Sequence, residues 1–324
     1  MLARHGLAPR KKWGQNFLTD GYVLAKIIAA AAPDAEDCVL EIGPGLGALT
    51  QGLLAHAGHV VAVELDKGLA DILSAEFSNQ AASGQFTLVR GDILKLDLAE
   101  ILAPYRHKRL KVVANLPYYI TTPVIMRLLE SGLGFTSITV MVQKEVAERM
   151  SAKPGTKAYG SLTLAVQYHA AAEMVATVPS RSFLPRPDVD SAVICLRALP
   201  QSPVDVDKDK LFAVIAAAFA TRRKTLVNAL HAAGFAAKAG INNINGGDKD
   251  NSRCASNEGE NKKAALAAAL VACGLRPDVR GEALDIHQFA AVAERVTQHS
   301  DVSFDSTTRN RKASNPTALN ANHD

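Results

Sequence analysis

The sequence predicts an α/β protein, in which an open and mostly parallel β-sheet precedes a small all-helical domain. Three observations lead to this prediction. In the first half of the chain, short apolar runs rich in β-branched residues alternate with helical segments, as in parallel sheets that are covered on both faces. Closely spaced strand-like segments follow. From about residue 200, the chain becomes rich in alanine and helical in pattern.

The parallel part of the sheet is predicted from apolar runs at residues 38–42, 59–64, 85–90, 110–115 and 137–142. Helical segments lie between these runs, such as GLADILSAEF (68–77) and the segment VIMRLLESG (124–132) after Pro123. Proline fits the first turn of a helix because its missing N–H has no partner there. Strands that alternate with helices indicate a parallel sheet with right-handed crossovers.

The remaining elements are predicted from the second half of the chain, first strands and then helices. Strand-like segments are read at 161–170, 172–178 and 191–197, which predicts that the sheet ends in antiparallel pairing. Helices are read at 210–219, 224–234, 263–273 and 286–296. We therefore expect a catalytic domain over 1–200 and a helical C-terminal domain over 201–299. The polar stretch 242–261 reads as a flexible insertion and 300–324 as a disordered tail.

Composition excludes several classes of protein. The 324 residues suit two domains, and the net charge of +4 is mild. Basic clusters at 10–12 and 222–224 are compatible with nucleic-acid binding. The four cysteines form no C-x-x-C pair and the histidines show no ligand spacing, so neither a metal nor a disulfide is expected. No apolar run approaches the roughly 20 residues that cross a bilayer, so no membrane association is expected.

Polar residues recur where the predicted parallel strands end. Gly43 and Gly45 lie in the turn after the first strand, where glycine permits a tight turn and close approach of backbone to a ligand. Glu64 ends the second strand, Asp92 follows the third, and Asn115 ends the fourth. Because ligands of open parallel sheets bind beyond the carboxyl ends of the strands, these residues predict one site.

The identity of the cofactor is narrowed by Asp92. The glycine turn and Glu64 suit NAD and S-adenosylmethionine (SAM) alike, since an acidic side chain can bridge ribose hydroxyls in both. A carboxylate at Asp92 can accept a hydrogen bond from an adenine amino group. Together with Glu41 just before the glycines, this arrangement resembles the Rossmann-like sheet of the class I SAM-dependent methyltransferases. An NAD-linked dehydrogenase is the competing interpretation.

The segment VVANLPYYITTP (112–123) suits methyl transfer to an exocyclic amine of a nucleobase. The lone pair of that nitrogen is delocalised, so acceptors for its N–H groups help more than a strong base. The Asn115 side-chain oxygen can be one acceptor and a backbone carbonyl of the Leu116–Pro117 step the other, because proline restricts its predecessor. The Tyr118 ring offers a stacking face, which contributes about 1–3 kcal/mol per base. A dehydrogenase leaves this segment unexplained.

NLPY is the N-x-P-Y motif of N6-adenine methyltransferases, and residues from about 10 to 298 resemble the ribosomal RNA adenine dimethyltransferase family. The resemblance is closest to the branch that modifies small-subunit (16S) ribosomal RNA. It implies that Asn16 and the backbone of Leu18 touch SAM, and that Phe183 packs on the target base opposite Tyr118. The glycine, ribose and adenine motifs resemble EIGPGLGALT, VAVELD and GDIL.

The resemblance implies dimethylation of two adjacent adenosines in the hairpin loop near the 3′ end of 16S rRNA. A loop base is already partly unstacked, so its extrusion costs less than from a duplex. The expected partner is 16S rRNA within the immature small subunit, met by a cytoplasmic monomer. Arg222, Arg223 and Lys224 are candidates for phosphate contacts, as are residues 10–12. A macrolide-resistance-type large-subunit dimethyltransferase and a non-catalytic ribosome assembly factor stay open.

Overall fold

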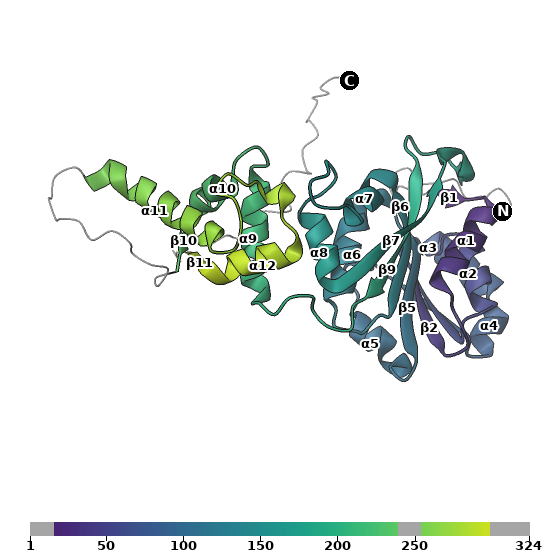
Figure 1. The fold of residues 1–324 in the computed structure, drawn as a ribbon. Coiled ribbons are helices and arrows are strands. Elements are labelled where there is room, and N and C mark those ends of the chain that lie inside the picture. Colours follow the sequence, from purple (N-terminus) through teal and green to yellow (C-terminus); the bar gives the residue numbers. More distant parts are fainter. Residues whose placement is uncertain (1–15, 239–253, 299–324) are drawn as a thin grey trace, which may run out of the picture.

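The computed structural model describes residues 16–238 and 254–298. Within them, a seven-stranded sheet in the order β4-β3-β2-β5-β6-β9-β7 is covered by helices on both faces (Figure 1). The parallel strands are β2 (Asp37–Ile42), β3 (His59–Glu64), β4 (Phe86–Arg90), β5 (Arg109–Asn115) and β6 (Ser137–Gln143). This arrangement confirms the α/β class and all of the parallel strands that the sequence predicts.

The two faces of the sheet carry separate apolar cores. Alternate residues of one strand enter different cores: Leu40 packs with Ile125 on one face, whereas Val39 packs with Ile27 on the other. A strand that is covered twice needs an apolar side chain at every position, which explains the continuous runs. The helices of this region are α1 (Gly21–Ala31), α2 (Ala48–Leu54), α3 (Lys67–Glu76), α4 (Ser78–Ala82), α5 (Leu98–Leu102), α6 (Thr121–Glu130) and α7 (Lys144–Met150), with the short 3-10 helices η3 (Ala103–Tyr105), η4 (Tyr118–Ile120) and η5 (Ser180–Ser182).

The sheet ends in antiparallel pairing, as the sequence predicts. Strand β9 (Ser191–Ala198) lies between β6 and β7 (Ala170–Val178) and is antiparallel to both. A second, very small sheet pairs β1 (Phe17–Leu18) with β8 (Phe183–Leu184), which sequence reasoning did not find. This pair brings the N-terminal motif next to the segment that precedes β9.

The strand predicted at 161–170 is wrong, because this segment forms helix α8 (Ser161–His169). Leu162 and Val166 pack into a core of the sheet, whereas Leu164 packs into the core of the helical region. A helix that is buried on two sides shows no single apolar stripe. Its alternating apolar positions therefore imitate the period of a strand.

The C-terminal region consists mainly of helices α9 (Lys208–Ala220), α10 (Leu226–Ala232), α11 (Cys254–Val271) and α12 (Ile286–Arg295), with the 3-10 helix η6 (Gly281–Ala283). It also holds an unpredicted antiparallel pair, β10 (Phe235–Ala237) with β11 (Val296–Gln298). The boundary near residue 200 falls between the end of β9 and the start of α9, and the division into two domains stays a prediction. Of the helices that the structure describes, none has the length and apolar character needed to cross a membrane.

The flexible insertion predicted over 242–261 is wrong for its second part, since residues 254–261 begin α11. Polar residues there are compatible with an exposed helix turn, and Lys262 Nζ lies 2.7 Å from Glu258 Oε1 one turn earlier. Composition alone does not separate such a turn from a loop. Residues 242–253 and the predicted tail over 300–324 lie outside the described residues.

Candidate active site

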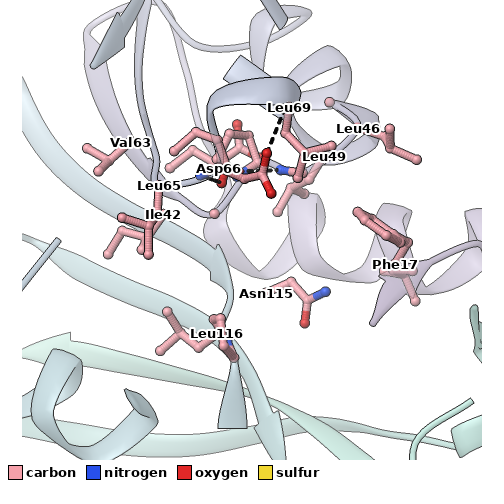
Figure 2. Close-up of a pocket in the computed structure, with 18 of the residues that line it drawn as sticks. Phe17, Ile42, Leu46, Leu49, Val63, Leu65, Asp66, Leu69, Asn115 and Leu116 are labelled. Carbon is pink, nitrogen blue, oxygen red and sulfur yellow. Dashed lines mark hydrogen bonds between the residues drawn. The ribbon is translucent and has the colours of Figure 1, made fainter. Parts of the chain in front are cut away.

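A cavity of about 500 Å³ lies at the carboxyl edge of the parallel strands (Figure 2). Its walls come from the turns that follow β2, β3, β4 and β5, together with β1. Most of the residues predicted for the site line it. They are Asn16, Leu18, Gly43, Gly45, Glu64, Asp92, Asn115, Leu116, Pro117 and Tyr118.

The glycine turn after β2 owes its shape to positive backbone angles. Gly45 has φ of +60°, and a Cβ there would lie 3.2 Å from the Phe17 ring. Gly47, which caps the start of α2, has φ of +80°, and a Cβ there would lie 2.6 Å from the Phe77 ring. Gly43 N–H donates to a β3 carbonyl at 2.9 Å, which fixes the turn against the neighbouring strand. Side chains are thus excluded from this wall of the cavity, where the backbone is exposed to a ligand.

Glu64 ends β3 and is 6% exposed. Its Oε1 accepts from the Asp66 N–H at 2.8 Å, and its Oε2 accepts from the Gly45 N–H at 3.2 Å. Burial raises the pKa of this carboxyl, and the two backbone N–H groups oppose the shift. Glu64 therefore joins the glycine turn to the turn after β3 and leaves its remaining acceptor capacity at the cavity.

Glu41 also lines the cavity. In the sequence it contributes only to the resemblance to SAM-dependent methyltransferases and is not a predicted site residue. It is 1% exposed, and neither carboxyl oxygen is aligned for a hydrogen bond with any described residue. Burial raises the pKa of Glu41 to about 8; the Glu64 carboxyl adds to the shift, and the neighbouring Thr50 hydroxyl opposes it. The carboxyl is therefore protonated at pH 7, and a positive charge placed beside it would favour its ionised form.

Asp92 follows β4, and its two carboxylate oxygens have different contacts. Oδ1 accepts from the Leu94 N–H at 3.0 Å, an ordinary turn contact, whereas Oδ2 lies 3.9 Å from Lys95 Nζ. The carboxylate thus stabilises its own turn and still reaches the cavity wall. Both the structural and the ligand-binding interpretation of this residue agree with its placement.

Asn115 is the last residue of β5, and its side chain extends into the space between Leu116 and Phe17 (Figure 2). Its Nδ2 donates to the Asn16 carbonyl at 3.1 Å, which orients the carboxamide oxygen. The Pro117 carbonyl accepts from the Ile120 N–H and the Thr121 hydroxyl, both at 3.2 Å. Because the Pro117 carbonyl is used within the turn, the Leu116 carbonyl is the better acceptor for a substrate.

Tyr118 begins η4 and is held by a residue that sequence reasoning missed. The Tyr118 hydroxyl lies 2.7 Å from Ser191 Oγ, and Ser191 is fully buried at the start of β9. Burial raises the pKa of Tyr118, and the Ser191 hydrogen bond opposes the shift. The only sequence signal was that Ser191 lies in the segment FLPRPDVDSAV (183–193), which begins with Phe183. The contact ties this segment to NLPY.

Phe183 is not brought to the cavity. It is 4% exposed, packs in a core with Val23 and Val178, and is absent from the cavity wall. Its neighbour Leu184 is 60% exposed instead. The predicted contact of Phe183 with a target base therefore has no support in this arrangement.

The three predicted RNA-binding cations differ in their contacts. Arg222 donates to the carbonyls of Lys157 and Tyr159 at 3.0 and 3.1 Å, so its side chain is used within the protein. Arg223 and Lys224 are exposed. Residues 10–12 lie outside the described residues. Within residues 16–238 and 254–298, no group of three histidine, cysteine, aspartate or glutamate side chains is placed to hold a metal ion.

Comparisons with known proteins agree on one family. A family model described as "Ribosomal RNA adenine dimethylase" matches residues 6–254. The protein named ribosomal RNA small subunit methyltransferase A from Streptococcus pneumoniae serotype 2 is 44% identical over 300 residues, which cover 91% of this chain and 94% of that protein.

Two solved structures share the fold. A dimethyladenosine transferase from Plasmodium falciparum has a TM-score of 0.66 at 26% identity, covering 85% of this chain and 95% of its own. The 23S rRNA methyltransferase ErmE has a TM-score of 0.63 at 23% identity, covering 86% and 99%. The second likeness concerns the fold alone.

Proposed function

This chain belongs to the ribosomal RNA adenine dimethylase family, and we propose that it dimethylates the N6 atoms of two adjacent adenosines in 16S rRNA. The proposed target is the hairpin loop near the 3′ end, presented by the immature small subunit. The observation that carries the proposal is the position of Asn115, Leu116 and Tyr118 at the same cavity as the glycine turn and Glu64. An adenine amino group held by the first set would face a cofactor held by the second.

The residues of the cavity fit SAM, the methyl donor of this family. Bound SAM supplies an electrophilic methyl group on a positively charged sulfur. The exposed backbone at Gly45 admits a ligand closely, and Glu64 and Asp92 offer acceptors for ribose hydroxyls and an adenine amino group. The buried Glu41 carboxyl, which has only the nearby Thr50 hydroxyl beside it and no aligned hydrogen bond among the described residues, suits a cation.

We assign the remaining chemistry to orientation. The Asn115 carboxamide oxygen and the Leu116 carbonyl would accept the N–H groups of the target amine and so orient its lone pair for methyl transfer. The Tyr118 ring, fixed through Ser191, stacks on the base and contributes about 1–3 kcal/mol. Alignment of the two reacting atoms supplies the larger rate factor. A pair of neutral acceptors also tolerates the second transfer, in which one N–H remains.

The test combines immature small subunits, unmethylated 16S rRNA and SAM labelled in the methyl group. Label recovered as N6,N6-dimethyladenosine in 16S rRNA is the expected result, and the variant Asn115→Ala serves as the inactive control. Label in large-subunit rRNA alone would favour the resistance-type alternative. Tight binding to small subunits without label would favour the assembly factor. A relative named for the small subunit at 44% identity favours the first outcome.

We further propose that the protein acts as a monomer in the cytoplasm and that its helical region, over 201–299, meets the RNA. Sedimentation of the full chain at micromolar concentration checks the first statement. A mass twice that of the chain would overturn it.

A further inference from the structure

The segment over residues 180–191, which lies between β7 and β9 and ends in the first residue of β9, is fixed at both ends. The Ser180 N–H donates to Asp190 Oδ1 at 2.9 Å, which joins the two ends to each other. Of the four serines that are buried among the described residues, three lie in this segment: Ser180, Ser182 and Ser191. Buried hydroxyls in native proteins nearly always have hydrogen-bond partners, so the partners of these serines show what the segment holds.

Ser182 holds the segment over residues 16–20, which precedes α1. Its hydroxyl donates to Asp20 Oδ2 at 2.9 Å, and its carbonyl accepts from the Thr19 N–H at 2.9 Å and from the Thr19 hydroxyl at 3.1 Å. The hydrogen bond from Ser182 lowers the pKa of Asp20, so the acceptor is a carboxylate at neutral pH. Three contacts of one serine therefore fix residues 16–20 against residues 180–191.

The segment over residues 16–20 in turn contacts Asn115. Phe17 in β1 pairs with Leu184 in β8, and Asn16 comes directly before this pair. The Asn16 carbonyl accepts from Asn115 Nδ2 at 3.1 Å. Because a carboxamide is planar, the contact made by its nitrogen also sets the direction of its oxygen. The orientation of the Asn115 oxygen thus depends on the position of residues 16–20.

The other end of the segment over residues 180–191 holds Tyr118. Ser191 Oγ lies 2.7 Å from the Tyr118 hydroxyl, and Ser191 is fully buried where β9 pairs with Gln143 of β6. Tyr118 and Asn115 are the two side chains assigned to the target base. Both are therefore held, one directly and one through residues 16–20, by the same short segment.

We propose that Ser182 is a positioning residue for methyl transfer, which acts on Asn115 through residues 16–20, and that the segment over residues 180–191 fixes Asn115 and Tyr118 relative to each other. The proposal rests on the proposed function, which assigns these two side chains to the target base. Ser182 does not line the cavity, so it acts only through its neighbours. The rate of transfer depends steeply on alignment, so a small displacement of either group is expected to lower it.

The first experiment measures single-turnover methylation of immature small subunits at saturating SAM. Ser182→Ala removes the hydrogen bond to Asp20 and is expected to lower the rate about fivefold, the change that corresponds to one ordinary hydrogen bond. Ser137→Ala, at a buried serine where β6 begins, is the matched control and should leave the rate unchanged. A wild-type rate in Ser182→Ala overturns the proposal.

The second experiment is a double-mutant cycle, which separates positioning from a general loss of stability. If Ser182 acts through Asn115, adding Ser182→Ala to Asn115→Ala should lower the rate by less than about twofold. By the same reasoning, Ser191→Ala should add less than about twofold to the loss in Tyr118→Phe. Losses that multiply in both cycles would show that the serines act on stability alone and would overturn the positioning role.

Amide hydrogen exchange of the protein without ligand gives a measurement that is independent of turnover. Exchange at Thr19 should be faster in Ser182→Ala than in Ser137→Ala, because the Thr19 N–H donates to the Ser182 carbonyl. Equal exchange in the two variants would contradict the link between Ser182 and residues 16–20. Thr19→Val removes the hydroxyl contact on the same carbonyl and should lower turnover likewise, so a Ser182→Ala variant that does not fold leaves the proposal testable.

The two proposals fail in different ways. If the wild type forms dimethyladenosine and Ser182→Ala forms it equally fast, only the role of Ser182 is wrong. If the wild type forms no dimethyladenosine on small subunits, the proposed function is wrong, whereas exchange at Thr19 still shows whether Ser182 holds residues 16–20.

Discussion

The two edges of the central sheet differ in whether their buried polar side chains have partners within the protein. At the amino edge, Asp37 is fully buried and lies between two cations. Lys111 Nζ is 2.8 Å from one of its oxygens, and Arg109 Nε forms an ion pair with the other at 2.9 Å. The Asp34 N–H donates to the same carboxylate at 2.8 Å. Its charge is thus compensated within the protein.

The amino edge also contains a buried imidazole whose ring nitrogens both have partners. His59 Nδ1 lies 2.8 Å from the Gly84 carbonyl, and its Nε2 lies 3.0 Å from Thr87 Oγ1. The ring stacks on Tyr105 with centroids 4.1 Å apart. These groups stabilise the fold and leave nothing for a ligand.

At the carboxyl edge, polar side chains that are equally buried have fewer partners within the protein or lie at the cavity. Glu41 has no aligned hydrogen-bond partner among the described residues, and Glu64 accepts two backbone N–H groups while it lines the cavity. The comparison teaches that this sheet gains stability at one edge and function at the other. A buried carboxylic acid without an aligned hydrogen-bond partner is costly, so the position of Glu41 at the cavity wall marks the ligand site.

The largest expected effect tests this division directly. Asp37→Ala should lower the free energy of unfolding by about 3 kcal/mol, because it removes the fully buried carboxylate that pairs with Lys111 and Arg109. Glu41→Gln should raise the free energy of unfolding at pH 7, because the unfolded wild type gains from ionising Glu41 whereas the folded carboxyl keeps its proton. Urea denaturation measures both. Equal destabilisation by the two variants would contradict the comparison.

Asn115→Ala should lower turnover by about 100-fold, the scale of removing one preorganised polar group from an active site. SAM affinity should stay within a few fold of the wild type, since Asn115 is assigned mainly to the target base. Single-turnover methylation and calorimetric titration measure the two quantities. The same change at Asn228, an exposed residue of α10, is the matched control. Equal losses in both quantities would make Asn115 a cofactor ligand only.

Glu64→Ala should weaken SAM binding by about 2 kcal/mol, the scale of charge-assisted hydrogen bonds. Glu64→Gln keeps one acceptor oxygen and should lose less. Calorimetric titration with SAM measures the affinity, and thermal unfolding without SAM shows how much of the loss comes from a looser Gly45 turn. Unchanged affinity in Glu64→Ala would remove this residue from the site.

The two edges should respond to pH with opposite signs. Between pH 4.5 and about 8, folded Glu41 keeps a proton that the unfolded chain has released, so its contribution to stability falls as pH rises through this window. Burial lowers the pKa of His59 below 6.5, so below that pH the unfolded chain takes up a proton that the folded one does not, and stability falls as pH drops.

Thermal unfolding of the protein without ligand, measured from pH 5 to 9, checks these signs. Each group changes the free energy of unfolding by up to about 1.4 kcal/mol per pH unit within its window. Glu41→Gln should flatten the alkaline side of the profile, and His59→Gln the acid side. A Glu41→Gln profile that still falls in parallel with the wild type between pH 6 and 8 would show that this carboxyl is not protonated.

The smallest expected effect concerns Tyr118→Phe, which keeps the ring and removes the hydrogen bond to Ser191. The free energy of unfolding should fall by about 1 kcal/mol, the net worth of one such bond. Turnover should fall less than in Tyr118→Ala, which removes the stacking face as well. If the Phe and Ala variants lose turnover equally, the hydroxyl and not the ring is the functional group.

The residues that line the cavity could be predicted from the sequence because the patterns that mark them are local. Gly45 and Asp92 follow a strand, Glu64 and Asn115 end one, and the carboxyl ends of parallel strands share one edge. Positions along the chain therefore convert directly into neighbours in space. The same reasoning gave no measure of how each carboxylate is paired, so the unpaired state of Glu41 was not foreseen.

Errors arose where the outcome depends on a distant partner. Helix α8 alternates like a strand because the sheet covers one side of it and the helical region covers the other. The contact of Phe183 with a target base stays a prediction, since its side chain is buried in a core beside β1. Arg222 reads as a free cation in RRK, but its partners belong to a loop more than sixty residues earlier.

The sequence by itself determined the α/β class, the segments that form the parallel strands and the residues at their carboxyl ends, because each of these follows from local pattern and chain order. Only the tertiary structure decided which polar groups are compensated, which aromatic rings face the cavity and which cations remain outside the protein's own contacts. Those properties depend on surfaces that meet after folding, and the pairing of a charge is a property of both partners.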